Sequence, residues 1–132
     1  MQCPVCAHQE LKQGQYHGKV EVHACSGCHG IWLQAQALDI LMGEVGEGLK
    51  APNVPSPSEK DCPRCRAESL CTVEYPYTNV NLDMCRKCKG VWVEQGKLKQ
   101  MSKELAEVKR WGLGKKRKKK GLLGRIKQWI GS

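Results

Sequence analysis

Apolar and polar residues alternate along two short stretches of the chain, each of which ends at a pair of cysteines. In 20–24, aliphatic residues occupy every second position with polar residues between them, and 80–84 repeat this alternation. A period of two over five residues predicts a short β-strand with one buried face. We expect a partner strand for each, over 11–16 and 70–75.

A helical pattern follows each of these cysteine pairs. Apolar residues recur three or four positions apart in 35–45 and, more regularly, in 98–108. Glycines weaken the first pattern beyond residue 43, and Gly112 and Gly114 end the second. Each half of the chain is therefore predicted to fold in the order turn, strands, turn and short helix.

The two halves are copies of one unit. CPRC at 62–65 aligns with CPVC at 3–6, and CRKCKGVW at 85–92 aligns with CSGCHGIW at 25–32. Both cysteine pairs, a glycine and a tryptophan recur at matching positions, with one extra residue in the second copy. The chain is a tandem repeat, and the spacing leaves open whether the copies contact each other.

The repeat divides the chain into four parts. Residues 1–48 are copy one and 61–112 are copy two. Between them, 49–60 contain three prolines and two serines, which predicts an extended, semi-rigid linker. Residues 113–132 form a tail of different composition.

The spacing of the cysteines predicts a metal site in each copy. Eighteen residues separate the two Cys-x-x-Cys pairs of copy one and 19 separate those of copy two, which is the spacing of a four-thiolate zinc site. A tight turn brings two sulfurs to one ion, and the hairpin returns the chain so that the second turn supplies two more. The predicted ligands of two zinc ions are Cys3, Cys6, Cys25 and Cys28 in copy one, and Cys62, Cys65, Cys85 and Cys88 in copy two.

Other uses of these residues are less favoured. Disulfides do not fit the reduced compartment that we expect, whereas a single iron ion, as in rubredoxin-like electron carriers, fits the same four thiolates. Histidine ligands are not expected, because none of the four histidines recurs in the repeat. The ninth cysteine, Cys71, has no counterpart and is interpreted as a spare thiol on a strand.

Four thiolates leave no open coordination position for water or substrate. Such a site is structural, so we predict a protein that is not an enzyme and has no small-molecule substrate. The free energy of metal binding is then also free energy of folding, about 10 kcal/mol or more in related peptides.

The quoted motifs resemble those of the bacterial transcription-factor-IIB-type zinc-ribbon proteins, whose pattern is CPxC, a hairpin and CxxCxGxWLDxGEL. The resemblance covers about 3–42 and 62–101. It implies two tandem zinc ribbons, each a short antiparallel hairpin plus a short helix, in a small metal-stabilised α+β fold. It also implies a nucleic-acid or transcription-related role. The acidic positions of the pattern are mostly lost, since Gln34, Ala37 and Lys97 stand at three of them.

Each copy carries a tryptophan, Trp32 or Trp92, four residues after its last cysteine. An exposed indole could stack on a nucleic-acid base. The interpretation that we favour is that each indole packs over the metal site and anchors the helix, because a ribbon has few other large apolar groups.

The positive charge is concentrated at the end of the chain. The net charge of the whole chain is +9, and 102–132 alone account for +9. On a helix, the apolar residues of 122–130 would share one face. The candidate contact residues for nucleic acid or an anionic membrane are Lys115, Lys116, Arg117, Lys118, Lys119, Lys120, Arg125, Lys127 and Trp129.

Three interpretations of the tail compete: a solvated segment, a phosphate-binding segment, and an anchor at an anionic membrane. We favour nucleic-acid binding, with the tail supplying charge and the ribbons supplying shape. The alternative is an adaptor that holds protein partners at a membrane surface, and an electron carrier is a weaker one.

We expect a cytoplasmic protein. Met1 and Gln2 lead directly into Cys3, without the basic start and apolar run of a signal peptide. No segment approaches the ~18 apolar residues of a membrane span. Under the alternative interpretation, the tail would hold the protein at the inner surface of the membrane.

Overall fold

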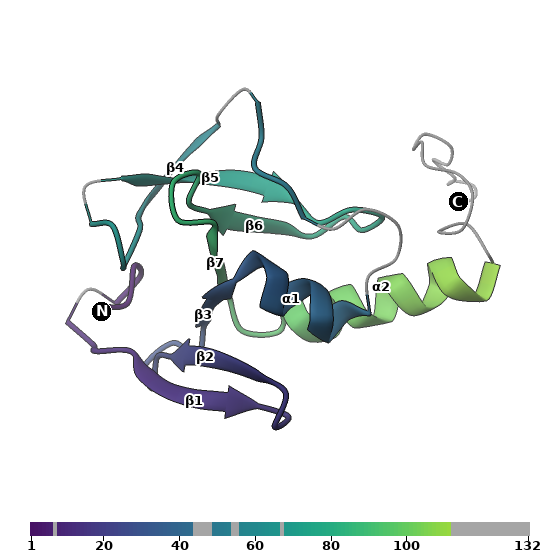
Figure 1. Ribbon diagram of the computed structural model, residues 1–132, viewed down its shortest axis with the longest axis horizontal. Coiled ribbons are helices and arrows are strands. Elements are labelled where there is room, and N and C mark those ends of the chain that lie inside the picture. Colours follow the sequence, from purple (N-terminus) through teal and green to yellow (C-terminus); the bar gives the residue numbers. More distant parts are fainter. Residues whose placement is uncertain (7, 44–48, 54–55, 67, 112–132) are drawn as a thin grey trace.

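The structure is a computed structural model that describes residues 1–6, 8–43, 49–53, 56–66 and 68–111 (Figure 1). The tail, with every candidate contact residue named above, lies outside them. Within these ranges, no helix has both the length and the apolar character needed to cross a lipid bilayer.

Copy one forms a hairpin, a short third strand and a helix. Strand β1 (Lys12–Tyr16) pairs antiparallel with β2 (Val20–Ala24), and the predicted bounds of β2 are confirmed. Strand β3 (Ile31–Gln34) then leads into helix α1 (Ala35–Met42). The helix ends at Gly43, whose left-handed backbone (φ 81°) lets its N–H bond to the carbonyl of Asp39.

Copy two repeats this order and adds one strand. Its hairpin consists of β5 (Ser69–Glu74) and β6 (Asn81–Met84), followed by β7 (Gly90–Val93) and the longer helix α2 (Lys97–Trp111). The hairpin strands and helices of both copies therefore form close to where the periodicities predicted them.

The additional strand, β4 (Pro57–Asp61), lies in the segment that was predicted to be linker. It pairs antiparallel with β5 at the edge of the sheet, where the missing N–H of a proline is tolerated. The ammonium of Lys60 lies 3.4 Å from a carboxylate oxygen of Asp83 and 3.5 Å from one of Glu94, which fixes this edge strand against copy two. Residues 57–60 of the predicted linker are thus part of the sheet.

The two copies join edge to edge in one seven-stranded sheet with the order β1-β2-β3-β7-β6-β5-β4 (Figure 1). At the seam, β3 and β7 are antiparallel, and Trp32 lies directly opposite Trp92. Neither strand was predicted, because four residues of mixed apolar character after a turn are too few to show a period. The seam answers the question that the repeat left open: the copies contact each other through the backbone.

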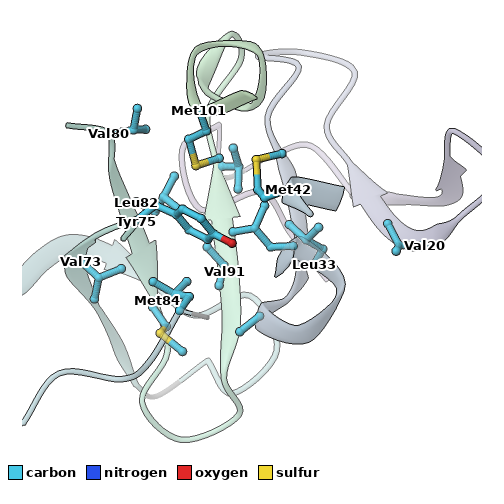
Figure 2. Close-up of a cluster of buried hydrophobic side chains, with 14 of the residues drawn as sticks. Val20, Leu33, Met42, Val73, Tyr75, Val80, Leu82, Met84, Val91 and Met101 are labelled. Atoms are coloured by element: carbon cyan, nitrogen blue, oxygen red, sulfur yellow. The ribbon is translucent and has the colours of Figure 1, made fainter. Parts of the chain in front are cut away.

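Side chains on opposite faces of this sheet form two separate cores. On one face, side chains from both copies pack under the helices; Figure 2 shows Leu33, Leu82, Val91, Met42 and Met101 among them. We call this the helix-side core.

The core on the other face, here called the indole core, is smaller. It contains four pairs of residues at equivalent repeat positions. They are Cys3 with Cys62, Leu11 with Leu70, Cys25 with Cys85, and Trp32 with Trp92.

A hydrogen-bond network under the helices also joins the copies. The buried carboxylate of Asp39 on α1 accepts a hydrogen bond from the Tyr75 hydroxyl of copy two (2.7 Å). The same Oδ1 atom accepts one from the backbone N–H of Leu49 (3.2 Å). One buried carboxylate therefore connects α1, the start of the linker and the second hairpin.

Candidate metal centres and the seam between them

The four predicted cysteines of copy one converge on one point. Two of them, Cys3 and Cys6, lie in the turn before β1, and Cys25 and Cys28 lie in the turn between β2 and β3. We call each such Cys-x-x-Cys turn a knuckle. All four Sγ atoms lie within 4.8 Å of one another. The closest pairs between the knuckles are Cys3 with Cys28 (3.7 Å) and Cys6 with Cys25 (3.8 Å).

Copy two builds the same cluster from its own two knuckles. Its closest Sγ pairs are Cys62 with Cys88 (3.7 Å) and Cys65 with Cys85 (3.9 Å). These pairs are the repeat equivalents of those in copy one, so both sites have the same pairing of sulfurs and nearly the same spacing. In each cluster two cysteines are buried and two are partly exposed.

The sulfur spacing fits a tetrahedral metal ion. Zinc–sulfur bonds of about 2.3 Å in a regular tetrahedron place the sulfurs about 3.8 Å apart, which matches the four distances above. The same distances are far longer than the bond of a disulfide, about 2.05 Å, and all nine cysteines are free. The donor set therefore suits a bound metal ion and excludes disulfides within the clusters.

Backbone N–H groups of the knuckles point at the sulfurs. In copy one, the N–H of Cys6 lies 3.2 Å from Sγ of Cys3, and the N–H of Gly27 lies 3.3 Å from Sγ of Cys25. Copy two has the same bond from Cys65 to Cys62 (3.2 Å). Such second-layer donors favour the thiolate form and orient it toward a metal ion.

The pKa values of the thiols diverge within each cluster. Burial raises the pKa of Cys25, but hydrogen bonds from the N–H groups of Cys28 and Gly27 outweigh it and lower that pKa to about 7. Burial, reinforced by hydrogen bonds with the neighbouring thiols, raises the pKa of Cys6 to about 12. A metal-free cluster thus retains protons at neutral pH that a metal ion must displace.

Each tryptophan packs against the glycine of the other copy. A Cβ atom added to Gly30 would lie 2.4 Å from Cζ2 of Trp92, and one added to Gly90 would lie 2.1 Å from Cζ2 of Trp32. Both indoles are buried, with exposed fractions of 2% for Trp32 and 0% for Trp92. The indoles pack in one core with the cluster cysteines, so packing at the metal sites is confirmed and base stacking by these indoles is excluded. The expectation that they anchor the helices is wrong, because the helices pack over the helix-side core on the other face of the sheet. That each indole covers the opposite copy was not predicted.

This reciprocal contact explains why a glycine recurs two positions after the last cluster cysteine of each copy. Neither Gly30 nor Gly90 has the positive φ that would demand glycine for its backbone. The requirement is instead for space, because an indole of the other copy occupies the volume of a side chain. The recurring Gly-x-Trp spacing was the available signal, but it does not indicate which copy the indole contacts.

The other residues considered as ligands, the histidines and Cys71, do not belong to the clusters. Among the described residues, no histidine lies close enough to the sulfurs to complete either group, as the lack of recurrence predicted. His29 is exposed on its knuckle, with a left-handed backbone (φ 63°). Cys71 is buried in β5 and belongs to neither cluster, which agrees with its interpretation as a strand thiol.

These features define a class of protein: small metal-stabilised ribbons whose knuckles supply four thiolates. The comparison with protein families makes the assignment specific. The transcription factor zinc-finger family, of the transcription-factor-IIB zinc-ribbon type, matches 2–44 and again 61–104, well over half of the chain. The chain belongs to this family and contains two tandem copies of its domain. No curated protein and no solved structure matches the chain.

Proposed function

We propose that this chain is a non-enzymatic zinc protein that binds nucleic acid, using two structural zinc ribbons as a rigid base and the basic tail as the main source of charge. Its metal-binding character follows from the family and the two thiolate clusters. The identity of the metal, the partner and the absence of catalysis are the proposal.

The support for zinc is the donor set together with the family. Four thiolates at the spacing measured above suit zinc, and the matching family is a zinc-finger family. Iron would suit the same sulfurs but would make the chain an electron carrier, for which a cationic tail has no evident use. When bound, zinc supplies a cross-link between the two knuckles of each copy.

The absence of catalysis is inferred from the saturation of both sites. All four ligands come from the protein, so a bound ion has no position for a water or substrate. The described thiols serve the clusters or, in the case of Cys71, lie buried in β5.

The observation that carries the choice of partner is the charge of the tail. Six consecutive cations, 115–120, precede Arg125 and Lys127. Lysine and arginine bind nucleic acid without reading its sequence, because they displace counterions from the phosphates. A tail of this kind would supply affinity, and the ribbons would hold it in a defined place.

The test is a salt titration of binding. Full-length protein and a variant ending at residue 114 are titrated with fluorescent duplex and single-stranded oligonucleotides at several salt concentrations. We expect the full chain to bind with a slope of several units in log K against log salt, and the truncated chain to lose most of that slope. No binding at about 50 mM salt, or a slope unchanged by truncation, would contradict the proposal.

The second candidate function is an adaptor at the inner surface of a membrane in the cytoplasm. It is favoured by the apolar residues that follow the cations, including Trp129, since phosphate binding does not require them. Sedimentation with vesicles that contain phosphatidylserine, without nucleic-acid binding, would support this function instead.

A further inference from the structure

The two copies differ most in charge at their knuckles. The knuckles of copy two read CPRCR and CRKCK, and those of copy one read CPVCA and CSGCH. Copy two thus places five cations around its metal cluster where copy one places none. We call these five residues the basic tip: Arg64, Arg66, Arg86, Lys87 and Lys89.

The fold brings the five cations of the basic tip to one small surface. Arg64 and Arg66 are on the first knuckle and the other three are on the second. The two knuckles meet at the metal cluster, where the Sγ atoms of Cys65 and Cys85 lie 3.9 Å apart. All five residues are exposed. The Lys89 ammonium donates a hydrogen bond to the carbonyl of Arg86 (2.6 Å), so it lies over its own knuckle.

These cations have no carboxylate partners in the described part of the chain. The ion pairs of copy two involve Lys60, Lys97 and Arg110 instead. Two cations of the basic tip also occupy unfavourable backbone positions, since φ is 67° at Arg66 and 64° at Lys89. Long side chains are uncommon in this left-handed region of backbone conformation, where glycine or asparagine would be less strained.

Copy one excludes a purely structural reason for the basic tip. Four thiolates around a divalent ion carry net negative charge, and nearby cations could compensate for it. Copy one builds a cluster with the same sulfur spacing, yet Val5, Ser26 and His29 stand at three of the equivalent positions. Compensation is therefore not needed to form the site.

We propose that the basic tip binds the phosphates of a nucleic-acid backbone and that copy one does not contribute such a surface. This inference rests on the proposed function and adds a second contact to that of the tail. The three arginines offer planar, paired donors that match phosphate oxygens, and the two lysines of the second knuckle add point charges.

The described surface favours nucleic acid over a membrane as the partner of the basic tip. Docking at a bilayer requires apolar side chains next to the cations. The large exposed apolar residues of the described chain are Met1, Val5 and Ile40, and all three belong to copy one. The basic tip is therefore a polar, cationic surface that suits a phosphate backbone.

The repeat itself supplies the test variant. Four substitutions in copy two each introduce the residue that copy one has at the same position, and we call them the copy-one substitutions: Arg64→Val, Arg86→Ser, Lys87→Gly and Lys89→His. The matched control removes four other exposed lysines, with the substitutions Lys12→Gln, Lys19→Gln, Lys99→Gln and Lys103→Gln. Both full-length variants change the net charge equally at about pH 8, where histidine is neutral. Zinc content and circular dichroism check that each is folded.

Binding to a fluorescent DNA duplex is measured over a range of salt concentrations. Each lost phosphate contact lowers the salt slope by about 0.9, so we expect the copy-one substitutions to lower it by about 3 and to weaken binding roughly tenfold or more at about 50 mM salt. The control should change the slope by less than about 1. If the copy-one substitutions impair zinc binding, Arg64→Gln with Arg86→Gln at the same surface should lower the slope by about 2.

The outcomes separate this inference from the proposed function. If the wild-type chain binds the duplex and the copy-one substitutions leave affinity and slope like those of the control, the basic tip is not a contact although the function stands. If the wild-type chain does not bind nucleic acid, both fail. If the substitutions weaken binding only to vesicles containing phosphatidylserine, the phosphates belong to lipid and the inference is wrong.

Discussion

Replacing Gly30 by alanine would place a methyl group within the volume of the Trp92 indole. The added Cβ would lie 2.4 Å from Cζ2 and 2.9 Å from Cη2 of that ring. Carbon atoms in contact are about 3.5–4.0 Å apart, so the overlap exceeds about 1 Å. The indole has no exposed surface and lies opposite Trp32 across the seam, which leaves it little room to move.

The expected cost follows from this overlap. Overpacking of a dense core costs about 1–3 kcal/mol, and two rigid rings place Gly30→Ala toward the upper end. At roughly 4 °C per kcal/mol for a domain of this size, the midpoint of thermal unfolding of the zinc-loaded protein should fall by about 4–12 °C. Gly14→Ala is the matched control, because Gly14 also lies in a strand but has open space where its Cβ would be.

A pair of double variants identifies the contacting indole. Trp92→Phe removes the ring atoms that the new methyl group would overlap, so its combination with Gly30→Ala should destabilise less than the sum of the single changes. Trp32→Phe changes the indole on the same copy as Gly30. Its combination with Gly30→Ala should therefore destabilise by an amount closer to the sum of the two single changes. Equal effects of Gly30→Ala and Gly14→Ala, or relief by Trp32→Phe alone, would refute the reciprocal packing.

Three further predictions follow from the metal clusters and the network between the copies. A strong chelator should unfold both copies, because the metal binding energy is folding energy; sheet and helix signals that persist in circular dichroism after complete metal removal would contradict this. Zinc affinity should fall by at least about a hundredfold for each pH unit below about 7. Raised pKa values keep Cys6 and Cys28 protonated in the metal-free cluster, so two or more protons compete with each zinc ion. A titration with a competing dye that shows a pH-independent affinity would refute this. Asp39→Ala should cost about 1–3 kcal/mol in denaturant unfolding, because it removes the buried acceptor of two hydrogen bonds, those from the Tyr75 hydroxyl and the Leu49 N–H, and Tyr75→Phe, which removes only one of them, should cost less. Equal stability of Asp39→Ala and wild type would show that the network does not join the copies.

The sequence predicted those elements whose signals are local. The alternation in 20–24 and the helical spacing in 98–108 report burial on one face, so the corresponding strand and helix were found. The metal clusters were predicted for the same reason, because a knuckle and its spacing are features of nearby residues. All eight cysteines come together as two groups of four.

The seam was missed because it depends on contacts between distant residues. Nothing in the four residues of β3 indicates that β7, nearly 60 positions later, pairs with it. The linker prediction failed at β4 for a related reason, since proline content argues against a central strand but not against an edge strand held by Lys60. Pairing of this kind is decided by tertiary structure and leaves no period in the sequence.

The measurement that tests the account most directly is the metal content of the purified chain, by native mass spectrometry alongside elemental analysis. We predict two zinc ions per folded chain, and one in a variant with Cys62→Ser and Cys88→Ser if that variant keeps copy one folded. A folded chain without bound metal, or one that carries iron with its visible absorbance, would contradict two structural zinc ribbons.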